Sequence, residues 1–164
     1  MNSAIERLLS LRVGDVMTAS PFLLNANVTM ADAAQTLRQH RVTGAPVTDD
    51  QGKCVGMLTA VDFMTHLLSA PMASGVAADD AENVLVQDAP GEPYHVETLD
   101  PDNVQNFMSE GVVTIPRESP IIDAARMMCR SHIHHLVVLD GERRPAGVIS
   151  SLDLVAAMIK AIEE

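Results

Sequence analysis

Aromatic side chains are nearly missing from this chain. Its 164 residues include no tryptophan, and its Phe and Tyr residues are Phe22, Phe63, Tyr94 and Phe107. A protein that binds single-stranded nucleic acid needs ring platforms for the bases and a basic groove for the phosphates. The sequence offers neither, so we expect no nucleic-acid partner.

Basic residues are absent from one long stretch. Between Lys53 and Arg117 there is no lysine or arginine, whereas the same stretch holds ten acidic residues. The formal net charge of −11 therefore arises almost wholly from this region, and the rest of the chain is nearly neutral at −1. Such a charge repels phosphates and anionic membranes. A solvated acidic connector is favoured over a surface that docks a partner.

Long apolar runs are lacking, and cysteines are few. No segment approaches the length of a membrane span, and the start of the chain, with Glu6 and Arg7 in a short amphipathic pattern, does not resemble an export signal. We expect a cytoplasmic protein with no membrane partner. Cys54 and Cys129 each lie in an apolar context, which predicts buried free thiols in a reducing compartment.

What the chain does contain is a duplication. Residues 16–70 can be laid over residues 107–161 at a constant offset of 91, without a gap. A unit of about 55 residues is too small to bury a core alone. We therefore expect two copies packed as one module about a pseudo two-fold axis, so that a cleft in one copy recurs in the other. The identical pairs are Met17/Met108, Asp32/Asp123, Ala33/Ala124, Ala34/Ala125, Val47/Val138, Asp49/Asp140, Gly56/Gly147, Asp62/Asp153 and Ala70/Ala161.

Each copy has the pattern strand, helix, strand, strand, helix, which predicts an α/β (α+β) fold. In the first copy Thr29 can cap a helix whose apolar residues recur at helical spacing, and Asp49 begins turn chemistry for a hairpin. The predicted elements are strand 22–24, helix 30–40, strands 45–47 and 53–58, and helix 59–69. In the second copy they are strand 112–115, helix 120–131, strands 135–139 and 146–149, and helix 151–162.

These patterns divide the chain into four parts. We expect an N-terminal helical lead-in (1–11), a first repeat (12–70), an acidic connector (71–102) and a second repeat (103–164). Repeated Pro and Gly residues in the connector argue against one long helix there.

Three motifs in each copy resemble the CBS domain, named for cystathionine β-synthase. The first copy has Asp15-Val16-Met17, Thr43-Gly44-Ala45-Pro46-Val47-Thr48-Asp49 and Gly56-Met57-Leu58-Thr59-Ala60-Val61-Asp62. The second copy has Asn106-Phe107-Met108, Ile133-His134-His135-Leu136-Val137-Val138-Leu139-Asp140 and Gly147-Val148-Ile149-Ser150-Ser151-Leu152-Asp153. The resemblance implies a Bateman module, a tandem CBS pair that binds adenosine compounds in clefts between the copies and regulates another protein. It implies AMP, ADP, ATP or S-adenosylmethionine as ligand, with no required cofactor.

The last helix of each copy begins with a hydroxyl residue and an aspartate three residues later. An aspartate there can accept hydrogen bonds from both ribose hydroxyls, and the first-turn amides favour a phosphate. The same spacing is also that of an ordinary helix cap, and spacing alone favours the cap. With the resemblance, we expect a first ligand site at Thr43, Gly44, Ala45, Pro46, Thr59 and Asp62. The second is expected at Thr114, Ile115, Pro116, His134, His135, Ser150 and Asp153.

The two expected sites differ in sequence. Thr114-Ile115-Pro116 matches a hydroxyl, apolar, Pro pattern common in the family, whereas Leu23-Leu24-Asn25 does not, and most basic residues lie in the second copy. We therefore predict that the Asp153 site is the stronger nucleotide site, although His134 and His135 could narrow it. The candidates for phosphate binding are Arg41, Arg117, Arg130 and His132.

Other functions receive less support from the sequence. His132, His134 and His135 straddle a helix end and a strand, where neighbouring side chains face opposite ways, so we expect no metal site. No nucleophile with a base and no Gly-rich phosphate loop is found, so we expect no enzyme activity. The expected function is a nucleotide sensor that forms a homodimer through its repeat helices and regulates a separate, unknown protein. A ligand-free dimerisation scaffold with vestigial pockets is the alternative.

Overall fold

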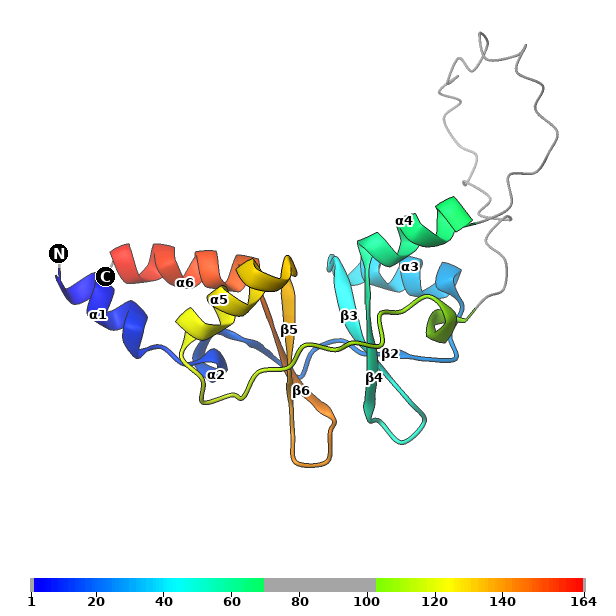
Figure 1. The fold of residues 1–164 in the computed structure, drawn as a ribbon, viewed down its shortest axis with the longest axis horizontal. Coiled ribbons are helices and arrows are strands. Elements are labelled where there is room, and N and C mark those ends of the chain that lie inside the picture. Colours follow the sequence, from blue (N-terminus) through cyan, green and yellow to red (C-terminus); the bar gives the residue numbers. More distant parts are fainter. Residues whose placement is uncertain (1, 70–102, 164) are drawn as a thin grey trace, which may run out of the picture.

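The two repeats form two halves that lie side by side (Figure 1). The structure is a computed structural model, and it describes residues 2–69 and 103–163. Each half has a three-stranded sheet with helices toward one side, and the turns of both hairpins protrude on the other side. This mixed helix and sheet architecture, repeated in tandem, confirms the predicted fold class. The predicted connector at 71–102 lies outside the described residues.

The helices and strands follow the predicted order closely. The first half contains β2 (Leu24–Asn25), α3 (Met30–His40), β3 (Gly44–Thr48), β4 (Cys54–Thr59) and α4 (Ala60–Ser69). The second contains α5 (Ile121–Ser131), β5 (His135–Leu139), β6 (Pro145–Ser150) and α6 (Ser151–Glu163). Ahead of these lie α1 (Asn2–Ser10), α2 (Val13–Val16) and β1 (Thr18–Ala19) in the first half of the sequence, and the 3₁₀ helix η1 (Val104–Asn106) in the second.

The first predicted strand of each copy is wrong in extent. Instead of residues 22–24, the structure has β2 at Leu24–Asn25, parallel to β3. Instead of residues 112–115, it has one isolated bridge between Thr114 and Val137. The apolar runs are present because these segments border the core, but few ladder hydrogen bonds join them to the sheet, so they are mostly extended connections.

Sequence chemistry fixes the ends of α3 and α5. Thr29 accepts a hydrogen bond from the Asp32 amide and so caps α3, as predicted. Pro120 stands at the start of α5, where its missing amide hydrogen costs nothing. Both helices end in a left-handed residue, Arg41 with φ 55° and His132 with φ 52°. The chain therefore leaves both helices in the same direction toward the following strand.

The two hairpins share one turn geometry. The Asp49 carboxylate accepts hydrogen bonds of 2.9 Å from the amides of Gln51 and Lys53. The Asp140 carboxylate accepts equivalent bonds from the amides of Glu142 and Arg144, at 2.9 and 2.8 Å. An aspartate that satisfies two turn amides explains why this position is identical in the two copies.

The repeats exchange their leading segments. Residues 13–19, the first lead segment, begin the first repeat but pack with the second: Val13 and Met17 join the core of that half, and β1 pairs with β6. Residues 104–109, the second lead segment, do the reverse, since Val104 is fully buried in the first core and Ser109 bridges to Met57 of β4. Neither repeat is complete without the other, so the copies fold as one module.

The exchange places a methionine over a glycine in both halves. A Cβ atom on Gly147 would collide with the Met17 side chain, and one on Gly56 would collide with the Met108 side chain and lie 3.1 Å from the carbonyl oxygen of Ser109. Met17 with Met108 and Gly56 with Gly147 are identical pairs of the duplication. Their identity is explained by this contact, because the methionine needs the space that the glycine leaves.

The cysteines fit the sequence expectation only in part. Cys54 is buried on β4, and burial raises the pKa of its thiol, which favours the protonated, unreactive form. Cys129 is exposed on α5, so the prediction that both thiols are buried is wrong. The apolar face of α5 consists of Ile121, Ala124 and Met128, and Cys129 lies one residue beyond it.

None of the helices in residues 2–69 and 103–163 is long and apolar enough to cross a bilayer.

Replacing Gly56 by Ala should destabilise the protein by about 1–3 kcal/mol, because the added methyl group overpacks the contact with Met108 and the Ser109 backbone. Urea unfolding measures the change. Gly141→Ala is the matched control, because nothing lies within 4 Å of a Cβ added there. Combining Gly56→Ala with Met108→Ala should cost less than the sum of the single changes, and strict additivity would contradict the proposed contact.

Candidate functional site

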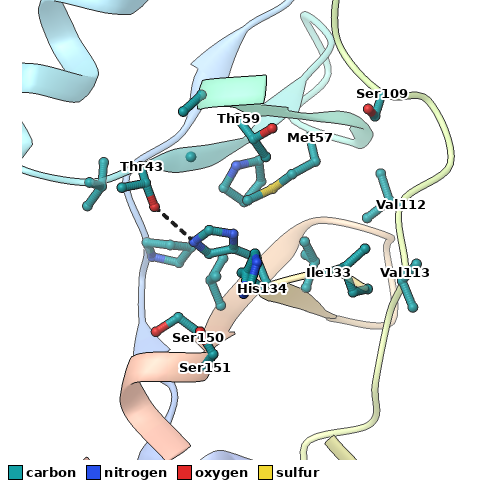
Figure 2. A pocket seen from close by; sticks show the side chains of 18 of the residues that line it. Thr43, Met57, Thr59, Ser109, Val112, Val113, Ile133, His134, Ser150 and Ser151 are labelled. Atoms are coloured by element: carbon teal, nitrogen blue, oxygen red, sulfur yellow. Dashed lines mark hydrogen bonds between the residues drawn. The ribbon is translucent and has the colours of Figure 1, made fainter. Parts of the chain in front are cut away.

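A cleft of about 780 Å³ lies between the two repeats. Figure 2 shows Thr43, Met57 and Thr59 on one side of the opening and Ile133, His134 and Ser150 on the other. Almost every lining residue has its counterpart at offset 91 in the lining as well, from Thr18 with Ser109 to Asp62 with Asp153. The duplicated sequence thus produces one continuous cleft with two related halves.

Each half of the cleft contains the start of a helix with a hydroxyl and aspartate pair. The carboxylate oxygen Oδ2 of Asp62 accepts hydrogen bonds from the Thr59 amide at 2.6 Å and from the Thr59 hydroxyl at 2.8 Å. Oδ2 of Asp153 accepts both equivalent bonds from Ser150 at 2.7 Å. The capping role weighed from the sequence is therefore present in both halves.

The second carboxylate oxygen distinguishes the halves. Oδ1 of Asp62 accepts a hydrogen bond of 3.0 Å from the Ser109 hydroxyl. Asp153 has no such bond to its Oδ1 from the residues that the structure describes. The cap occupies one oxygen of each aspartate, so at Asp153 the other oxygen can still accept hydrogen bonds from a ligand, while at Asp62 it is already used.

An arginine and a histidine line the cleft at equivalent positions. Arg41 follows α3 and His132 follows α5, and both are exposed. Each is the left-handed residue that ends its helix, and the offset of 91 relates one to the other. They therefore line the cleft from opposite repeats. A guanidinium from one repeat and an imidazole from the other are therefore available to contact a phosphate in the cleft.

His135 connects the two repeats across the cleft. Its Nε2 atom lies 3.4 Å from the Thr43 hydroxyl, the contact drawn as a dashed line in Figure 2. Burial first, and then the neighbouring His134, hold the pKa of His135 below its usual value of 6.5, although Asp153 acts in the opposite direction. The free protein therefore favours a neutral imidazole at this position.

Most of the expected site residues do line the cleft. The lining includes Arg41, Thr43, Gly44, Pro46, Thr59, Asp62, His132, His134, His135, Ser150 and Asp153. Whether they bind a ligand stays a prediction. The lining also includes residues that were not among the predicted site residues: Phe22, Met57, Ser109, Val112, Val113, Ile133 and Val148. Strand alternation could have indicated Met57 and Val148, since each precedes the hydroxyl residue of its strand by two positions.

Six expected residues do not line the cleft. Ala45 and Ile115 are core residues with exposures of 1% and 3%, because Ala45 faces away from Gly44 and Pro46 along the strand and Ile115 packs in the second core. Arg117 instead lies against Gly14 of α2. Thr114, Pro116 and Arg130 are exposed outside the lining. The pattern Thr114-Ile115-Pro116 thus lies outside the lining, and its role in a stronger second site stays a prediction.

The part of the chain that the structure describes shows no arrangement of side chains suited to a metal ion. No group of three or more His, Cys, Asp or Glu residues is placed there to hold an ion.

Two segments of the chain, residues 13–69 and 104–160, match the family model of the CBS domain. The chain belongs to the CBS domain family. It is 27% identical over 155 residues to a CBS domain-containing protein of Dictyostelium discoideum, and the match covers 92% of this chain and 93% of that protein.

Solved CBS domain pairs have the same fold. The CBS pair of protein MJ0100, in complex with 5′-methylthioadenosine and S-adenosyl-L-methionine, is 20% identical with a TM-score of 0.69, covering 94% of this chain and 98% of that one. CBSX2 in complex with AMP is also 20% identical with a TM-score of 0.69, covering 93% of this chain and 98% of that one.

Some relatives are larger proteins. The chain is 23% identical to an L-aspartate semialdehyde sulfurtransferase of Methanocaldococcus jannaschii and covers 87% of its own length but only 22% of that enzyme. A match to about a fifth of an enzyme does not transfer the enzyme's activity to the matching part.

We expect the folding stability of this CBS pair to fall as the solution is acidified below about pH 6.5. The pKa of His135 lies below its unfolded value of 6.5, so the unfolded chain binds more protons, and the contribution of the neutral imidazole is lost as the pH falls toward the folded pKa. Urea unfolding at about pH 7.5 and about pH 5.5 measures the loss. His135→Gln should reduce it, and an equal loss in the variant would exclude His135 as its source.

Proposed function

We propose that this CBS pair is a regulatory module that binds an adenosine nucleotide in the cleft between its repeats. The observation that carries the proposal is that Asp153 lines the cleft at the start of α6 with its Oδ2 in the helix cap, while no residue of the described ranges 2–69 and 103–163 donates to its Oδ1. A carboxylate fixed in this way can accept hydrogen bonds from the two hydroxyls of a ribose without unfolding the helix.

The cleft also offers suitable side chains for the base and the phosphate of such a ligand. Val137, Val148 and Ile133 offer aliphatic walls to a base, and Arg41 offers a positive charge and His132 a ring nitrogen to a phosphate. The similar CBS pairs bind AMP, S-adenosyl-L-methionine or 5′-methylthioadenosine, and a CBS domain of a CNNM/CorC family Mg²⁺ transporter binds ATP. These ligands support AMP, ADP, ATP or S-adenosylmethionine as the ligand class here, acting as a signal and not as a required cofactor.

The proposed module acts on a separate protein. Ligand in the cleft contacts both repeats, so it favours one packing of the repeats over others, and a partner that distinguishes these packings responds to the nucleotide. The cytoplasm, where adenosine nucleotides are abundant, is the proposed location.

An exposed apolar stripe favours self-association of the module. On α4, Leu68 is 86% exposed, and on α6, Leu152 is 73% exposed. The exposed residues occupy equivalent positions on the two helices, which suits a two-fold symmetric contact with a second copy. We therefore propose a homodimer through α4 and α6, whether or not the cleft is occupied. The stripe consists of Val61/Leu152, Met64/Val155, Leu67/Met158 and Leu68/Ile159.

Asp153→Ala should weaken the binding of AMP by about one to two orders of magnitude, because a charge-assisted contact to the ribose is removed. Asp62→Ala should have a smaller effect, since Ser109 already uses the second oxygen of Asp62. Isothermal titration calorimetry with AMP, ADP, ATP and S-adenosylmethionine measures both, with Asp123→Ala, on α5 outside the cleft, as the control. Wild-type protein that binds none of them at millimolar concentration would leave only the scaffold function.

Leu68→Glu combined with Ile159→Glu should convert the proposed dimer to a monomer, because two charges per chain are placed in the apolar contact. Light scattering coupled to size-exclusion chromatography measures the mass. Ile122→Glu is the control, because Ile122 is a partly exposed apolar residue on α5 outside the stripe. A wild-type protein of monomer mass would contradict the homodimer.

A further inference from the structure

The ionisable side chains that line the cleft are unusual in their balance. They are one arginine, two aspartates and three histidines: Arg41, Asp62, Asp153, His132, His134 and His135. With neutral imidazoles, Arg41 faces two carboxylates, and the lining carries one net negative charge. If all three imidazoles bind a proton, the lining carries two net positive charges. The attraction of this cleft for an anion therefore depends on protons bound by histidines.

All three histidines that line the cleft lie in the second repeat. At the positions that offset 91 relates to His132, His134 and His135, the first repeat has Arg41, Thr43 and Gly44. The permanent charge of the first repeat is thus replaced by titratable groups in the second.

His135 has the position best suited to respond to a ligand. It is half-buried, and groups from several elements share its cleft: His134 beside it, Asp153 on α6, Asp62 on α4, and Arg41 and His132 at the ends of α3 and α5. Within the described residues, its imidazole makes one hydrogen-bond contact, with the Thr43 hydroxyl. A hydroxyl donates to a neutral imidazole nitrogen and accepts from a protonated one, so this contact is compatible with both states.

We propose that an anionic ligand enters this cleft together with a proton, and that His135 is the side chain that takes up the proton. The inference rests on the proposed function and specifies it: the ligand carries a phosphate or an equivalent anionic group, and an uncharged nucleoside gains nothing from the proton. In the free protein, burial and His134 lower the pKa of His135, whereas an anion in the same cleft favours the charged imidazole. By linkage, whatever promotes protonation of His135 also promotes binding of the anion.

Calorimetric titration of AMP in buffers of different ionisation enthalpy measures the protons taken up per ligand. Wild type should take up more protons than His135→Gln, by about half a proton to one proton near pH 6.5. Comparing the two proteins removes the proton that the phosphate of AMP itself binds. Between about pH 7.5 and about pH 6, wild-type affinity for AMP should rise more steeply than that of the variant, with one added proton bounding the excess at tenfold per pH unit. Adenosine should show no such excess.

His40→Gln is the matched control, because this exposed imidazole stacks on Phe22 and does not line the cleft, so its proton uptake should equal that of wild type. If His135→Gln does not fold, the imidazole resonance of His135 in wild-type protein gives the same information, since its titration midpoint should move to higher pH when AMP is added. Equal proton uptake in wild type and His135→Gln, or a midpoint that AMP leaves unchanged, would overturn this inference alone. Failure of AMP, ADP and ATP to bind at any pH would overturn the proposed nucleotide function with it.

Discussion

The contact between a methionine of one repeat and a glycine of the other is the constraint on which the module depends. Met17 covers Gly147 and Met108 covers Gly56, and each contact anchors a lead segment that also completes a sheet and a core of the opposite repeat. A repeat of about 55 residues cannot bury enough apolar surface alone. The exchange solves this problem twice with the same pair of residue types, so neither half is an independent folding unit.

The exchange of lead segments also helps to form the cleft. The lead segments continue past the methionines to Thr18 and Ser109, which line the cleft, so the packing that joins the repeats also supplies part of the cleft lining. One hydrogen bond distinguishes the two aspartates: the Ser109 hydroxyl donates to Oδ1 of Asp62, whereas no described residue donates to Oδ1 of Asp153. A protein can keep the capping aspartate in both halves for stability and use only one of them for recognition, because capping requires one carboxylate oxygen and binding requires the other.

The sequence predicted what depends on local chemistry. The capped start of α3 at Thr29, the Asp49 turn and the two aspartates of the cleft all follow from residues close together in the chain. It did not predict the exchange, because nothing in the pattern around Val13 indicates whether it packs with the near or the distant repeat. Ile115 was misplaced for a related reason: a motif names neighbouring residues together, whereas an extended chain sends neighbouring side chains to opposite sides.

The exchange also bears on how this chain folds during synthesis. Val104, which fills the first core, is made 35 residues after α4 ends at Ser69. While the ribosome adds those residues, the segments of the first half have been synthesised but Val104, which completes their core, has not, so apolar side chains stay accessible to mispairing and to chaperones. The pairing of the first lead segment is delayed even longer, because its partner strand β6 is among the last elements to be translated. A slow ribosome would therefore expose this protein to aggregation more than it would a protein whose halves close in order.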